Sequence, residues 1–313
     1  MRRTFAAAVG SRPLLFEASP PSQRAPAKRS ADHLVEVVEL VRSLPRVDAI
    51  DVPELIDENH EGRPYYRSGD SRPFAQTLQE RTGCEAVVNK VVAHLSSKEE
   101  LERWAQDTVA RSLHHAVLVG GTSRFIPYPG PPVIEADRTC RAAFEGVQGL
   151  IGNIAIPQRA GEPHRLLSKT RAGARFFTTQ ILFDSGPVLA MIQEYDLLCR
   201  KAAIRPGAVV LCYAPMIDEG DAQFIRWLGA DIPEEAERAI LAGTESEATE
   251  RSTSHTLRLW EEVRRAITRD GTEVPVGASV EEITPRHFSA AADMLRALAR
   301  EIDRDVVDPR PGP

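Results

Sequence analysis

Short apolar runs alternate with amphipathic stretches along almost all of the 313-residue chain, and this alternation limits the fold more than any other feature. Short continuous apolar runs between turn signals are typical of buried parallel strands, whereas apolar residues at helical spacing are typical of helices packed on them. The pattern predicts eight strands, at residues 14–16, 47–52, 85–92, 116–119, 150–156, 176–183, 209–213 and 274–280.

The stretches between these strands predict the helices. Strands alternating with helices define an α/β protein, and eight such units favour a single closed (β/α)₈ TIM barrel, here with extra helices between strands 7 and 8. An open doubly wound sheet is the rival, but it is expected to carry a glycine-rich turn after strand one, where this chain has Ala18-Ser19-Pro20-Pro21. We expect a flexible N-terminus over 1–12, a catalytic barrel domain over 13–305 and a loose tail over 306–313. The predicted helices lie at about 30–43, 72–82, 98–112, 133–147, 163–171, 187–202, 219–229, 233–242, 245–269 and 285–303.

Composition excludes several classes of protein. The formal net charge is −6 and the pI is near 5.8, so we expect no nucleic-acid partner, because such proteins carry a basic excess. The four cysteines show no CxxC spacing and the eight histidines form no ligand pattern, so neither a disulfide framework nor a metal site is expected. No run approaches the roughly 18 to 20 apolar residues of a membrane span. We therefore expect a cytoplasmic protein with no membrane partner.

Residues at the carboxyl ends of barrel strands line the active sites of such folds, and Glu17 stands at the end of strand one. A carboxyl group that ends an apolar strand is partly desolvated, which raises its pKa and suits it to donate a proton near neutral pH. The alternative is a structural acid tied to a neighbouring arginine. Lys90 admits a Schiff-base role, but a lysine that reaches solvent or forms a salt bridge is the favoured interpretation. The Gly120-Gly121 pair would let a flat ring or a phosphate approach the backbone.

Four segments, in the same chain order, make the sequence similar to the methylenetetrahydrofolate reductases over about residues 12–215. The opening Phe-Glu-x-x-Pro-Pro is matched at 16–21, and the segments 81–86 and 117–122 resemble the family's third and fourth strands. The fourth match is the longest: a lysine at 169, Ala-Gly-Ala at 172–174 and Thr-Gln-x-x-Phe-Asp ending at Asp184 follow the family spacing.

The resemblance implies roles for individual residues. Glu17 would give the proton to the folate N10, and Gln180 would bind the pterin. Thr122, at the position of a family aspartate, and Glu58, in the acidic loop 53–58, would contact the substrate. Gly120 and Gly121 would leave space for the nicotinamide. Lys169 would bind a cofactor phosphate, with an ordinary surface lysine as the equal alternative.

Departures from the family pattern fall on flavin contacts. Thr122 replaces an aspartate, residues 156–159 replace a Tyr-Pro-Glu segment, and Val88-Asn89 stands near a missing Pro-His. The chain therefore resembles the flavin-independent branch, in which NAD(P)H as co-substrate passes its hydride directly to the folate, and bound FAD is disfavoured.

The hypothesis is an NAD(P)H-dependent oxidoreductase of one-carbon metabolism and methionine biosynthesis, reducing 5,10-methylenetetrahydrofolate to 5-methyltetrahydrofolate. Two alternatives stay open: a non-catalytic barrel that binds folate or a nucleotide, and a pterin-dependent methyltransferase barrel. The sequence does not decide between NADH and NADPH, nor the oligomeric state.

Overall fold

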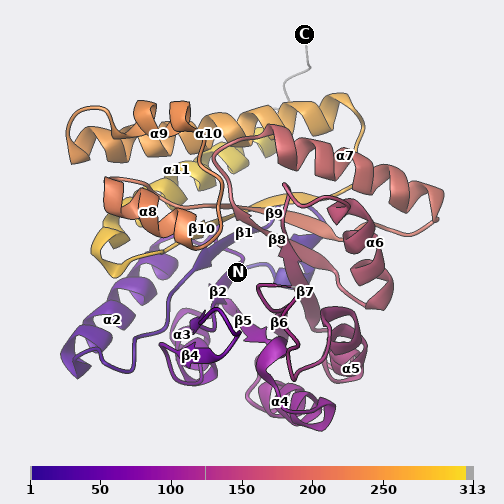
Figure 1. Ribbon diagram of the computed structural model, residues 1–313. Helices are drawn as coiled ribbons and strands as arrows, with labels where there is room; N and C mark the ends of the chain where they lie inside the picture. The colour runs from indigo at the N-terminus through magenta and orange to yellow at the C-terminus, as the bar shows by residue number, and fades with distance from the viewer. Residues whose placement is uncertain (1, 124, 308–313) are drawn as a thin grey trace.

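The computed structural model describes residues 2–123 and 125–307 and confirms the predicted closed barrel (Figure 1). Eight parallel strands pair with their chain neighbours around the ring, and the last pairs with the first to close it. The strands are β1 (Leu14–Glu17), β2 (Ala49–Val52), β5 (Glu85–Val91), β6 (His115–Val119), β7 (Leu150–Ala155), β8 (Phe176–Ile181), β9 (Ala208–Tyr213) and β10 (Val276–Glu281).

Helices surround the barrel (Figure 1), and three of them fill the β9–β10 connection, where the sequence predicts extra helices. Short 3₁₀ turns lie at Val92–His94 and Pro285–His287. The helices that follow the strands are α2 (Ala27–Ser43), α3 (Arg72–Thr82), α4 (Lys98–Ala110), α5 (Val133–Glu145), α6 (Glu162–Ala172), α7 (Gly186–Lys201), α8 (Glu219–Trp227), α9 (Glu234–Leu241), α10 (Glu245–Arg269) and α11 (Phe288–Val307).

Strand residues alternate between two separate cores. Leu15 packs inside the barrel in one cluster with Val87 and Val210. Leu14 and Phe16 belong instead to the large cluster between the strands and the helices. Because successive strand side chains point to opposite faces, this alternation fixes which polar residues face the barrel interior.

The N-terminal segment differs from the flexible stretch expected over 1–12. Residues Phe5–Val9 form helix α1, and Phe5 is fully buried in the interior cluster. Its ring packs edge-on against Phe176, with the centroids 5.1 Å apart, and its backbone N–H donates to Glu85 Oε2 at 2.5 Å. The helix closes the N-terminal end of the barrel. A five-residue apolar segment is too short to predict such a helix from the sequence.

A small hairpin follows strand two, in a segment for which the sequence predicts no strand. Strands β3 (Ile56–Glu58) and β4 (Pro64–Tyr66) pair antiparallel. Asn59 Oδ1 accepts the backbone N–H groups of Glu61 and Arg63, and Gly62 takes a positive φ of 76°. Polar side chains on these short strands hide the alternation that would mark them in sequence.

The C-terminal helix extends to Val307, two residues into the expected loose tail of 306–313. The rest of that predicted tail, 308–313, lies outside the described residues. In the described part of the chain, no helix has the length and apolar character needed to cross a membrane.

Candidate active site at the barrel mouth

Three carboxyl groups stand side by side at the carboxyl end of the barrel. Glu17 on β1 is in register with Asp51 on β2 and with Glu281 on β10. Leu15 and Ala49 pack in the interior cluster, so Glu17 and Asp51, each two residues later, face the interior as well. Glu281 follows Val280, which packs on the outside, and therefore faces inward too.

Glu17 is partly exposed at the floor of this mouth, with protein atoms covering most of its surface. Burial raises the pKa of its carboxyl group well above the ordinary value, and the charges of Glu281, Asp51 and Glu282 raise it further. Both desolvation and like charges disfavour the ionised carboxylate, so both effects act to keep the proton on Glu17.

The two neighbouring acids are also perturbed. Burial raises the pKa of Asp51 to about 7, although a hydrogen bond from Asn89 opposes the shift. Burial likewise raises the pKa of Glu281 to about 7, against a hydrogen bond from the Cys212 thiol. Asp51 and Glu281 therefore titrate near neutral pH, beside Glu17.

Gln180 lies at the end of β8, across the barrel from these acids, and holds a loop in place. Its Nε2 donates to the carbonyl oxygen of Leu228 at 2.6 Å, just after α8. Gly229 has a positive φ of 94°, and a Cβ there would come within 3.2 Å of Gln180 Nε2. The pterin-binding role of Gln180 stays a prediction.

Glu58 and Thr122, both predicted to bind substrate, bind each other. Thr122 Oγ1 donates to Glu58 Oε2 at 2.8 Å, and the Tyr128 hydroxyl donates to the same oxygen at 2.7 Å. His94 Nε2 lies 2.8 Å from the other carboxylate oxygen. Burial pushes the pKa of Glu58 upward, but the hydrogen bonds from Tyr128, Thr122 and His94 outweigh it and lower the pKa. The network fastens the β3–β4 hairpin to the loop after β6.

The two glycines after β6 permit close packing within the chain. A Cβ at Gly121 would lie 2.1 Å from the Tyr128 ring, and one at Gly120 would lie 3.1 Å from Val133. The Tyr128 ring therefore occupies the space beside Gly121 in which the sequence predicts that the nicotinamide binds.

Lys169 is also engaged within the chain. Its Nζ donates to the Ile154 carbonyl oxygen at 2.7 Å and lies 3.7 Å from Glu162 Oε1. Burial lowers the pKa of this ammonium group, and the Glu162 carboxylate counteracts part of that effect. The side chain is therefore not an ordinary surface lysine, and its role in binding a cofactor phosphate stays a prediction.

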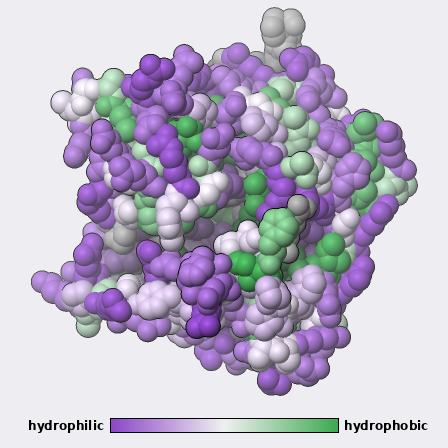
Figure 2. Space-filling model, in the orientation of Figure 1, coloured by the Kyte–Doolittle hydropathy of each residue, from purple (hydrophilic) through white to green (hydrophobic). Residues whose placement is uncertain are grey.

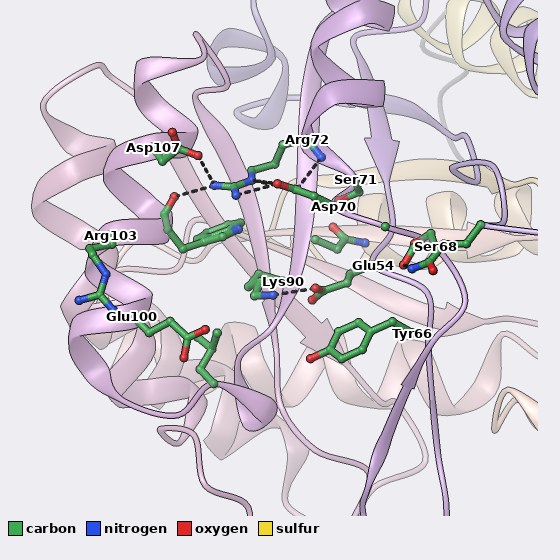
Figure 3. A pocket seen from close by; sticks show the side chains of 15 residues that line it. Glu54, Tyr66, Ser68, Asp70, Ser71, Arg72, Lys90, Glu100, Arg103 and Asp107 are labelled. Atoms are coloured by element: carbon green, nitrogen blue, oxygen red, sulfur yellow. Dashed lines mark hydrogen bonds and ion pairs between the residues drawn. The ribbon is translucent and has the colours of Figure 1, made fainter.

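A cavity of about 600 Å³ opens beside Asn89, between the hairpin, α3 and α4 (Figure 3). Lys90 and Glu54 point toward each other in it, with Nζ 2.6 Å from Oε1. This ion pair agrees with the salt-bridged interpretation of Lys90. Tyr66 lines the same space. Asn89 also hydrogen-bonds Asp51, so the cavity adjoins the acid cluster.

The hairpin and α8 meet above the acids. The Arg67 guanidinium lies 5.2 Å from the centroid of the Trp227 ring. In the barrel order, β1 and β10 lie between β2 and β9, so this contact spans the strand ends that carry Glu17 and Glu281. Figure 2 shows a largely hydrophilic rim around this face, with hydrophobic residues gathered near its centre.

Among the described residues, one group of side chains has metal-ligand geometry, although the sequence predicts no metal site. Ligand atoms of Asp218, Asp221 and His287 lie within 4.8 Å of one another. Arg286 Nη2 already lies 2.8 Å from Asp218 Oδ2 and 3.6 Å from Asp221 Oδ1. The charge of the acids is thus matched by a side chain of the same chain.

The fold and the site define a parallel (β/α)₈ barrel whose carboxyl end is lined by acids. No family model matches the chain, and no curated protein matches it. Among solved structures, an uncharacterized protein from Clostridium thermocellum has a TM-score of 0.75 and 14% sequence identity over 95% of this chain and 98% of the other. That protein is described as binding two copies of 5-methyl-5,6,7,8-tetrahydrofolic acid. At this identity the likeness shows the shared fold.

Sequence reasoning missed two members of the acid cluster, Asp51 and Glu281. The strand-end rule that selects Glu17 would have selected Glu281, had strand eight been carried one residue beyond Val280. Asp51 lies within β2. Only the alternation of inward and outward side chains along β2, with Ala49 inward and Val52 outward, could have placed Asp51 inside the barrel.

Proposed function

We propose that the protein reduces a methylene group carried on tetrahydrofolate, using hydride from NAD(P)H and a proton from Glu17. The observation that carries this proposal is the position of Glu17 at the end of β1, facing the barrel mouth beside Asp51 and Glu281, where burial and like charges raise the pKa of its carboxyl group. Proton donation to N10 opens the methylene bridge and leaves a cationic iminium carbon at N5. Hydride from the nicotinamide adds to that carbon and gives the methyl product.

The folate is proposed on two grounds. The motifs that include Glu17 and Gln180 resemble those of the methylenetetrahydrofolate reductases. The similar barrel from Clostridium thermocellum is described as binding 5-methyl-5,6,7,8-tetrahydrofolic acid, which is the product of this reaction. General acid catalysis by Glu17 requires its carboxyl group to reach the accepting nitrogen directly or through one water.

Direct hydride transfer requires both substrates to be bound together. The cavity of about 600 Å³ beside Asn89 has the volume of a typical small-molecule site and adjoins the mouth, which supports two ligands at one end of the barrel. The packing of Tyr128 on Gly121 and the internal contacts of Lys169 favour catalysis without bound flavin.

The test is steady-state kinetics of the purified protein with NADH or NADPH and 5,10-methylenetetrahydrofolate, with and without added FAD. We expect turnover that is independent of FAD and initial-rate plots that intersect. Parallel lines with stimulation by FAD would indicate a flavoprotein that alternates between two forms. Absence of turnover in a protein that binds 5-methyltetrahydrofolate would favour the non-catalytic barrel, which the folate-binding neighbour also supports.

Gln180→Ala is expected to raise KM for the folate, because the variant loses an amide that can both donate to and accept from the pterin. Loss of a hydrogen bond to a buried partner costs about 1 to 3 kcal/mol, roughly 5- to 150-fold in affinity. Calorimetric titration with 5-methyltetrahydrofolate measures the effect. Because Gln180 also anchors Leu228, the urea unfolding midpoint of the variant is measured as the control for loop displacement. Folate affinity equal to that of wild type would remove Gln180 from the site.

A further inference from the structure

Glu17, Asp51 and Glu281 occupy equivalent heights on three adjacent strands. Neighbouring strands lie about 4.8 Å apart, so three inward carboxyl groups in register are close enough to repel one another when ionised. Asp51 is 3% exposed, and its Oδ1 has no hydrogen-bond partner among the described residues. The interactions that act on the three groups include no lysine, arginine or histidine of the described chain.

The hydrogen bonds around these three groups differ, and the difference favours ionisation of Asp51 and Glu281 over ionisation of Glu17. Asp51 accepts from Asn89 and from the Val52 backbone, which favours its ionised form. Glu281 accepts from the Cys212 thiol, with the same effect. Glu17 has no such donor among the effects on it, and it faces the charges of Glu281, Asp51 and Glu282.

We propose that Asp51 and Glu281 are positioning residues for the proton: as the acids of the cluster that accept hydrogen bonds, they keep Glu17 in the acid form until the substrate accepts its proton. This inference rests on the proposed role of Glu17 as the general acid. The inference adds that the protonation of Glu17 depends on two side chains, one from β2 and one from β10. Neither of them needs to touch the substrate.

The groups that face Glu17 come from three sides. Asp51 lies on β2, Cys212 on β9, and Glu281 with Glu282 at the end of β10. Glu282 lies 3.5 Å from His33 Nε2 of α2, and burial raises its pKa to about 8, so it carries less charge near neutral pH than the other two acids. Asp51 and Glu281 are therefore the neighbours whose removal should change Glu17 most.

The experiment follows protonation of Glu17 directly. The infrared carbonyl band of its neutral carboxyl group is isolated as the difference between each protein and its Glu17→Gln derivative, recorded across a pH series. In Asp51→Asn and in Glu281→Gln, loss of a like charge should move the titration midpoint of Glu17 down by about one to two pH units. Asp51→Glu, which keeps the charge, should restore most of the wild-type midpoint.

Asp137→Asn is the matched control, because Asp137 is a buried carboxyl group with a raised pKa on α5, outside the cluster. It should leave the Glu17 midpoint unchanged. Circular dichroism identifies any variant that does not fold. Asp51→Asn and Glu281→Gln lie on different strands, so one folded variant is enough for the test. A wild-type midpoint in the folded variants would overturn the proposal.

The titration needs neither substrate nor turnover, so it separates this inference from the proposed function. If the protein is a reductase, the same variants should also move the high-pH limb of kcat/KM to lower pH. The direction follows because the active form is protonated: activity is present below the pKa of Glu17 and is lost as the pH rises through it. A shifted midpoint without any turnover would leave the inference standing and remove the reductase.

Discussion

Glu17→Gln is expected to reduce turnover of 5,10-methylenetetrahydrofolate by about 10²- to 10⁴-fold, the usual contribution of a general acid. Glutamine keeps the size and hydrogen-bonding capacity of the side chain but cannot transfer a proton to N10. It also removes a carboxyl group whose pKa is raised by burial and by neighbouring acids, so folding should not suffer. Rates should be measured under conditions in which hydride transfer limits turnover.

Two further measurements test whether the loss of turnover in Glu17→Gln comes from the lost proton donor. Calorimetric binding of 5-methyltetrahydrofolate should persist in Glu17→Gln, because the product requires no proton from the enzyme. Glu39→Gln, an exposed acid on α2, is the control for loss of one negative charge and should retain the wild-type rate. If Glu17→Gln kept more than about a tenth of the wild-type rate, its role as general acid would be wrong.

The barrel could be predicted because its evidence is local and repeated. Each strand is an apolar run such as Val209–Tyr213, and each is followed by an amphipathic stretch, so small errors in one element do not alter the fold. Glu17 could be proposed for a related reason, since the end of a strand and the mouth of a barrel coincide.

The remainder of the site depends on contacts between residues far apart in sequence. Glu58 and Thr122 could each be singled out, but not their hydrogen bond, which closes the hairpin against the loop after β6. The register that sets Glu281 beside Glu17 joins the last strand to the first, and nothing in either segment specifies the pairing. Lys169 illustrates the opposite case, in which a matched motif position is occupied by a buried internal contact.

The N-terminal helix leads to the second large expected effect, which concerns stability. Phe5 is fully buried and contacts Phe176 and His115 at the start of their strands, with both ring centroids 5.1 Å away. Phe5→Ala should lower the free energy of unfolding by about 3 to 5 kcal/mol, because the lost ring leaves a cavity where the barrel interior is rigid. The variant should also unfold at a markedly lower temperature.

Leu197→Ala on α7 is the matched control, because it removes an apolar side chain that is 49% exposed and should change stability little. Urea unfolding of the two variants, followed by circular dichroism, measures the difference. The large effect is expected at Phe5 because no other described part of helix α1 combines full burial of an aromatic ring with a backbone hydrogen bond to Glu85. A midpoint for Phe5→Ala no lower than that of Leu197→Ala would show that the barrel is stable without the helix at its base, as the sequence alone suggests for residues 1–12.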